Sequence, residues 1–176
     1  MKRVLLSAFS LLMCMSASAG VTFNPDKVKA VYIVRFANFI HWPQESSLKQ
    51  INYCVIGNNQ VTNLLESILV QHQVRNIPVV FRQVNNQEEL DDCQLVYLTP
   101  ESCRLGELKI DRLGLVTVSD ERAFSESMGM VEFREKSGRI VPVINVDNVA
   151  KNNITIRSQL LRISKIISTP QGVEHD

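Results

Sequence analysis

The sequence predicts a single α/β domain with a largely parallel central sheet, helices on both faces and a C-terminal hairpin plus helix. Three observations lead to this fold class. Four short apolar runs rich in β-branched residues alternate with helical or turn-like segments, which is the pattern of βαβ units. The right-handed crossovers of such units place helices on both faces of the sheet. Nearer the C-terminus, two extended stretches flank a turn-rich tip, which predicts a hairpin.

The first residues form a segment of a different kind. Lys2 and Arg3 precede an apolar run over residues 4–15, and a small-x-small pattern ends at Ala19. These features are typical of a signal peptide, here residues 1–19, cleaved after Ala19. An uncleaved membrane anchor is the alternative, but the apolar run falls short of the roughly 20 residues that a spanning helix needs. We therefore expect an exported, soluble protein of the periplasm.

The domain is expected to span residues 20–168 and to be followed by a flexible tail over residues 169–176. No linker rich in Ser, Gly or Pro divides it, and the sequence contains no internal repeat. The formal net charge is +1, which gives no electrostatic footprint for nucleic acid or an acidic membrane surface. We therefore expect no nucleic-acid partner.

The mature chain is expected to open on a helix. Asn24 is a favourable N-terminal cap, and Pro25 suits the first helical position. The helix is expected to end at Trp42, since Pro43 disfavours helical geometry at the residue before it. Its apolar residues recur at helical spacing and are Val28, Val31, Tyr32, Phe36, Phe39 and Ile40.

The next part of the chain predicts the central sheet. Four apolar runs are short enough for buried strands, and a helix is expected between the first two, over residues 61–73. Thr99 and Ser119 each stand at the end of a run and are expected to open two further helical segments. The four expected strands are residues 51–57, 78–84, 93–99 and 113–119.

The C-terminal part predicts a hairpin and then two helices. Residues 129–134 and 139–146 flank the tip at residues 135–138. Asp147 is expected to cap a short helix, and Ser158 a terminal one. The terminal helix would face the core through Ile156, Leu160, Ile163 and Ile167.

Residues with catalytic chemistry form no recognisable pattern. The Gly-x-Gly-x-x-Gly and Walker-type phosphate loops are absent, and no nucleophile elbow marks out a serine. His41, His72 and His175 stand apart, whereas a zinc site needs clustered Cys, His or carboxylate ligands. We therefore expect no catalytic residues, no cofactor and no metal, and a binding protein rather than an enzyme.

Three cysteines remain after cleavage of the signal peptide. Cys54 and Cys93 both lie in expected core strands, and they become neighbours if those strands are adjacent. A buried pair is expected to form a disulfide in an oxidising compartment. We predict a Cys54–Cys93 disulfide and a free Cys103. The alternative is that all three are small buried hydrophobic residues.

A series of motifs runs in order through nearly the whole mature chain. It resembles the motif order of the YfiR-like family of periplasmic proteins, whose opening helix is commonly KAAFLYNFAKFVEWP. The other family motifs with counterparts here are CHILFIS, TVSD, GGMINF, INLDAA and ISSQLLKLA. The matching stretches of this chain are residues 36–43 (FANFIHWP), 51–57 (INYCVIG, with Cys54 in place), 93–98 (CQLVYL), 116–120 (VTVSD), 129–133 (GMVEF), 144–147 (INVD) and 156–161 (IRSQLL).

The resemblance implies a regulatory function. Family members repress a membrane-bound diguanylate cyclase by binding its periplasmic region, which lowers cyclic di-GMP and biofilm formation. An OmpA-like outer-membrane lipoprotein sequesters the repressor. The family forms homodimers, and a disulfide joins the positions matched here by Cys54 and Cys93. A second family disulfide near residues 125–132 has no counterpart, because that stretch lacks cysteine. The alternative function is a periplasmic small-ligand-binding module that feeds another sensor system.

A partner-facing patch is expected on the hairpin and the short helix that follows it. Pro142 interrupts the second hairpin strand, which suits an edge strand or a bulge. An edge offers unpaired backbone groups to a partner. The hypothesis assigns Val131, Phe133, Val143 and Val149 to this patch; the alternative is that the four side chains complete the core.

Overall fold

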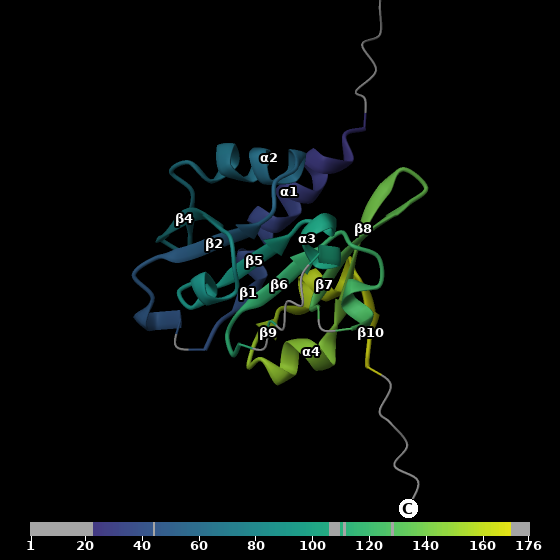
Figure 1. The fold of residues 1–176 in the computed structure, drawn as a ribbon. Helices are drawn as coiled ribbons and strands as arrows, with labels where there is room; N and C mark the ends of the chain where they lie inside the picture. The colour runs from purple at the N-terminus through teal and green to yellow at the C-terminus, as the bar shows by residue number, and fades with distance from the viewer. Residues whose placement is uncertain (1–22, 44, 106–109, 111, 128, 170–176) are drawn as a thin grey trace, which may run out of the picture.

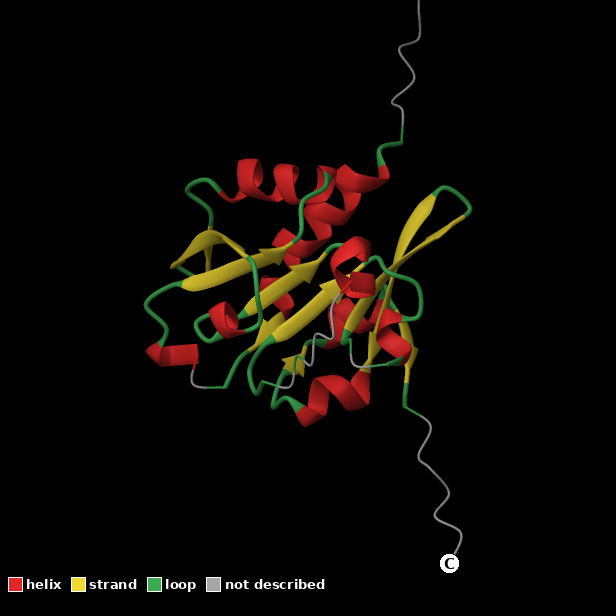
Figure 2. Cartoon of the chain, viewed as in Figure 1, coloured by secondary structure: helices red, strands yellow, loops and turns green. Residues whose placement is uncertain are grey.

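The structure is a computed structural model that describes residues 23–43, 45–105, 110, 112–127 and 129–169. The predicted signal peptide lies outside these residues, as does the predicted tail apart from Thr169. Within them the chain forms one α/β domain around an eight-stranded, mostly parallel sheet (Figures 1 and 2). The predicted fold class is confirmed.

The first helix begins where predicted but ends earlier. In α1 (Pro25–Phe36), the Asn24 side chain accepts a hydrogen bond from the Lys27 backbone N–H at 2.9 Å. The helix was expected to continue to Trp42, but a short 3₁₀ turn, η1 (Ala37–Phe39), and β1 (Ile40–His41) follow Phe36. Arg75 explains the change, because its guanidinium donates to the carbonyls of Ala37 and Ile40. A second, two-stranded sheet pairs β1 with β9 (Thr155–Ile156).

The four predicted strands form the centre of the sheet and are parallel. The strand order across the sheet is β10-β8-β7-β6-β5-β2-β4-β3. The chain passes from β2 to β4 on one side and then crosses β2 to place β5 on its other side, with β6 and β7 parallel beyond. The bounds are β2 (Ile51–Ile56), β3 (Gln73–Val74), β4 (Ile77–Val84), β5 (Leu95–Leu98), β6 (Val116–Ser119), β7 (Val131–Lys136), β8 (Arg139–Asn145) and β10 (Lys165–Ile167).

Helical segments cover both faces of the sheet. The larger core lies under α1 and α2 (Gln60–Leu69), which pack on alternate residues of the central strands. A smaller core on the other face surrounds Cys54 and Cys93. It is covered by α3 (Pro100–Leu105) and by the 3₁₀ turns η3 (Glu88–Leu90) and η4 (Phe124–Glu126), through Cys103, Leu90 and Phe124. A further 3₁₀ turn, η2 (Glu45–Ser47), leads into β2.

Two of the predicted helical segments differ from the structure. The helix expected over residues 61–73 ends at Leu69, because residues 73–74 pair with β4 in a tight hairpin as β3. The helix expected from Ser119 is replaced by bends and by η4, which begins after Ala123 in the left-handed conformation (φ 61°). The helical turn expected from Thr99 is present as α3.

The predicted C-terminal hairpin is confirmed as β7 and β8. Ser137 and Gly138 both have positive φ, 51° and 68°, as a two-residue type I′ turn requires. The strand β10 pairs with β8 at residues 143–145 only. Over residues 139–142, which include Pro142, no strand of the described chain lies on the outer side of β8. As expected at Pro142, residues 139–142 of β8 therefore form an edge of the sheet, whereas residues 143–145 do not.

The predicted terminal helix is wrong beyond its first turn. Only α5 (Ser158–Arg162) is helical, and residues 165–167 form β10, parallel to β8. The β-branched isoleucines of this segment suit a strand, and the outer side of β8 supplies the backbone groups to pair with. Ile163, expected in the core, is 55% exposed. The helix α4 (Val146–Lys151) is present, but Asn145 rather than Asp147 caps it.

Candidate functional site

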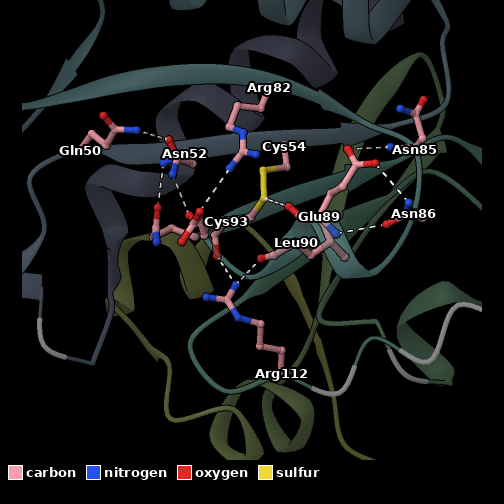
Figure 3. The surroundings of a disulfide bond; sticks show 12 residues. Gln50, Asn52, Cys54, Arg82, Asn85, Asn86, Glu89, Leu90, Cys93 and Arg112 are labelled. Atoms are coloured by element: carbon pink, nitrogen blue, oxygen red, sulfur yellow. Dashed lines mark hydrogen bonds and ion pairs between the residues drawn. A yellow bond between two sulfur atoms is a disulfide. The ribbon is translucent and has the colours of Figure 1, made fainter.

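The disulfide joins β2, at the centre of the sheet, to the loop before β5, which is the neighbour of β2 in the sheet. Cys54 lies on β2 and Cys93 just before β5, with their Cα atoms 6.0 Å apart and both side chains fully buried. Arg112 lies beside the pair and donates to the carbonyls of Leu90 and Cys93 (Figure 3). The Asn52 side chain also donates to the Asp92 carbonyl at 2.7 Å. The predicted pairing is confirmed.

Cys103 is free, as predicted, and half-buried on α3. Its Sγ lies 3.4 Å from Ser119 Oγ. Burial raises the pKa of the Cys103 thiol, although the Ser119 hydroxyl works in the opposite direction. The thiol is therefore protonated at neutral pH and is a weak nucleophile.

The four residues assigned to the partner-facing patch lie inside the domain. Val131, Phe133, Val143 and Val149 are 0%, 4%, 1% and 6% exposed. Phe133 stacks on Phe36 with ring centroids 5.7 Å apart, and the Tyr32 ring centroid lies 6.0 Å from that of Phe133. Their side chains therefore complete the core, as the alternative held. That a partner contacts the elements which carry them stays a prediction.

Glu132 is a buried carboxylate to which the sequence pattern assigned no role. It lies on β7 and is 1% exposed. It accepts hydrogen bonds from the Ser125 backbone N–H at 3.1 Å and from Ser125 Oγ at 2.8 Å, and it is paired with Arg134. Burial alone would raise the pKa of Glu132, but the Arg134 and Ser125 hydrogen bonds and the Arg134 charge outweigh it and lower that pKa. The signal in the sequence is a charged residue between Val131 and Phe133 in an apolar strand.

Glu132 and two asparagines hold the loop between β6 and β7 in place. Asn145 donates to the carbonyl of Ser125 at 2.8 Å. Asn148 donates to the carbonyls of Ser127 and Gly129 at 3.1 Å and 2.9 Å. The loop backbone is therefore fixed by buried side chains of β7, β8 and α4.

The carboxyl ends of β2 and β5 mark the switch point of the sheet, where open α/β sheets bind ligands. Here the chain fills that position with its own side chains. A Cβ atom at Gly57, after β2, would lie 2.1 Å from Thr99 Oγ1 and 2.3 Å from Ser102 Oγ. Ser102 Oγ donates to the Ile56 carbonyl at 3.0 Å. The Gly57 turn is consequently a packing contact between two strand ends.

A polar network connects the carboxyl ends of β5 and β6 to α1. Tyr97 donates to Asp120 at 2.6 Å, and Asp120 is also paired with Lys29. Burial, together with the charge of Asp120, raises the pKa of the Tyr97 phenol. The phenol therefore stays protonated, and the network links α1 to the ends of β5 and β6.

Gly57 gives a direct test of this packing. We expect Gly57→Ala to lower the free energy of unfolding by about 2–3 kcal/mol, because the methyl group both meets Thr99 and Ser102 and occupies a left-handed residue (φ 87°). Chemical denaturation measures the change. Gly138→Ala is the matched control, since its φ is 68° but its Cβ would meet nothing within 4 Å. A loss no larger than that of the control would contradict the close packing.

The described residues show neither a metal centre nor a membrane span. Among them, no group of three or more His, Cys, Asp and Glu side chains is placed to hold a metal ion. No helix in the same residues is long and apolar enough to cross a membrane.

The fold and these sites define a disulfide-linked α/β domain whose buried polar groups fix loops and strand ends. A family model for YfiR/HmsC-like proteins matches residues 26–165, which is nearly the whole domain. The chain belongs to this family, whose members are periplasmic, non-catalytic regulators of diguanylate cyclase. A search of curated proteins finds no match.

Proposed function

We propose that this protein is exported to the periplasm and inhibits a membrane-bound diguanylate cyclase by binding the cyclase's periplasmic region. Inhibition lowers cyclic di-GMP and biofilm formation. Family membership over residues 26–165 is the observation that carries this proposal. The proposal includes cleavage of the signal peptide after Ala19, a homodimer, and release of the cyclase when an OmpA-like outer-membrane lipoprotein sequesters the repressor.

The filled switch point favours a protein regulator over the alternative of a small-ligand-binding module. Thr99 and Ser102 lie where a ligand would enter between β2 and β5, and their hydroxyl oxygens are hydrogen-bonded to each other at 2.8 Å. A ligand at this position would have to displace both side chains. Recognition through an outer surface requires no such rearrangement.

The hairpin and the short helix after it remain our proposed partner-binding region. Val131, Phe133, Val143 and Val149 anchor β7, β8 and α4 to the core. Because these side chains are buried, their contribution to binding is to hold the outer surface of these elements in shape. The half-open outer side of β8 and the edge strand β10 carry the backbone groups that a partner can pair with.

Deletion of the gene tests the proposed function. We expect cyclic di-GMP and biofilm mass to rise in the deletion strain, because the cyclase loses its inhibitor, and to return to the starting level when the full chain is supplied from a plasmid. Mass spectrometry of cell extracts measures cyclic di-GMP. An inactive variant of the cyclase in the same deletion background is the control and is expected to abolish the rise. An unchanged level of cyclic di-GMP in the deletion strain would contradict the proposed function.

A further inference from the structure

The outward face of α1 carries a strip of half-exposed apolar residues between two exposed cations. Its core face carries Ala30, Ile33 and Val34, which are all buried. Val28, Val31 and Tyr32 remain half-exposed, although Val28 and Tyr32 also pack against the edge of the core. An apolar strip that remains accessible on a helix surface is a candidate contact for another protein segment.

The neighbouring helix α2 is the natural comparison. Val61, Leu65 and Leu69 of α2 face the core, Leu64 and Ile68 are half-exposed, and its exposed positions include the uncharged Asn63 and the acidic Glu66. The two helices lie side by side on the same face of the sheet, and α1 also contacts β8 (Figure 1). What distinguishes α1 is therefore the pair of exposed cations, Lys27 and Arg35, beside its half-exposed apolar residues.

A shallow groove of about 360 Å³ lies on this face of α1. Val28, Val31 and Tyr32 line it, with Lys27 and Arg35 at its two ends. Neither cation has an acidic partner within the described residues. Their positions differ by eight residues, which is about 12 Å along a helix. By contrast, Lys29 is paired with Asp26 and Asp120.

The groove continues the aromatic cluster that covers the hairpin. Tyr32 contacts both Phe36 and Phe133, with ring centroids 6.0 Å apart in each pair. Tyr32 thus lies between Phe133, which the sequence placed in a partner-facing patch, and the surface of the molecule. On the side of Phe133 that faces Tyr32 and Phe36, the surface of the molecule belongs to α1.

We propose that the groove over Val28, Val31 and Tyr32 binds an amphipathic segment of the partner protein, whose apolar residues enter the groove and whose carboxylates pair with Lys27 and Arg35. Two unpaired cations flanking an apolar strip are complementary to such a segment. Anionic lipid surfaces are recognised by clusters of about four to eight basic residues, which this face lacks. The inference rests on the proposed function, since it adds the groove of α1, which contacts β8, to the surface that binds the periplasmic region of the cyclase.

Charge reversal at both ends of the groove tests the inference. The double variant Lys27→Glu/Arg35→Glu, and separately Val31→Glu, are expressed as full chains in the deletion strain. The double variant Lys49→Glu/Arg162→Glu is the matched control, because it changes the net charge equally at exposed positions before β2 and at the end of α5, outside the hairpin and α4. The carboxylate introduced by Val31→Glu would lie four residues from both Lys27 and Arg35, which keeps the helix folded through ion pairs. Thermal unfolding verifies that each variant folds.

We expect both groove variants to bind the purified periplasmic region of the cyclase about tenfold more weakly or worse, and to leave cyclic di-GMP high. The control is expected to match the wild type. Groove variants that bind and lower cyclic di-GMP like the wild type would overturn the inference while leaving the proposed function in place. An unchanged cyclic di-GMP level on deletion would instead overturn the proposed function, and the inference with it. If the wild type binds phosphatidylglycerol vesicles and the groove variants do not, the groove contacts a membrane surface rather than a protein, and the inference is overturned.

Discussion

Removing the Cys54–Cys93 disulfide is expected to lower the free energy of unfolding by about 4 kcal/mol. The bridge closes a loop between residues 39 apart in sequence, for which the chain-entropy relation gives about this value. Reduction by dithiothreitol leaves two small thiols in the apolar space that the disulfide filled, so packing changes little. Guanidinium denaturation with and without reductant, and of Cys54→Ala/Cys93→Ala, measures the loss.

Cys103→Ser provides the control for this measurement. Cys103 is half-buried and already faces Ser119 Oγ, so a hydroxyl keeps a hydrogen-bonding partner. We expect its effect to stay within about 0.5 kcal/mol, as for most substitutions outside the core. An equal loss in the Cys103 variant, or a loss below about 1 kcal/mol on reduction, would contradict the assigned contribution of the bridge.

The parallel core of the fold could be predicted because its strands are buried on both faces. Such strands appear in the sequence as short, nearly continuous apolar runs, and β2 and β5 have no exposed residue. Burial of both cysteines in such runs pointed to the Cys54–Cys93 pairing, and the structure meets its condition by placing β2 beside β5. The hairpin could be predicted for a related reason, since Ser137 and Gly138 supply the turn.

The errors lie where a contact distant in sequence decides the local structure. Arg75 bonds the carbonyls that would continue α1, and nothing near residue 36 signals this. The isoleucines of residues 163–167 fit a helical stripe and a strand equally well, and the open side of β8 selects the strand. In both cases the local pattern is compatible with two structures, and tertiary contacts choose between them.

The candidate site could be predicted only as a region. The hairpin is present, but α1 covers Phe133 through Tyr32 and Phe36. The sequence pattern identified these aromatic residues as core-facing, yet it could not say which of them would form the outer layer. Glu132 was missed for a different reason. Side chains alternate along β7, so Glu132 lies on the other face of the sheet from Phe133, where it contacts Ser125. That contact depends on the conformation of the loop between the two residues, which the sequence pattern does not reveal.

Glu132→Gln is expected to lower the free energy of unfolding by about 2–3 kcal/mol at pH 7, as for the loss of hydrogen bonds to a charged group. The carboxylate is 1% exposed, so water cannot replace the lost charge pairing with Arg134. The Ser125 N–H and hydroxyl would then face a neutral amide, which weakens their hold on the loop before β7. Urea denaturation over a range of pH measures the effect.

The pH dependence separates a charge effect from a packing effect. The folded-state pKa of Glu132 is lowered from its ordinary value of 4.5, so the ionised group stabilises the fold above pH 4.5. This stabilisation is lost as the pH falls through the lowered pKa, because the folded protein then takes up the proton as well. The difference between wild type and Glu132→Gln should therefore be constant near neutrality and shrink in acid. The exposed Glu135 on the same strand is the control, and Glu135→Gln should change little at any pH. A difference for Glu132→Gln that persists unchanged into acid would show that shape, rather than the buried charge, ties the loop to β7.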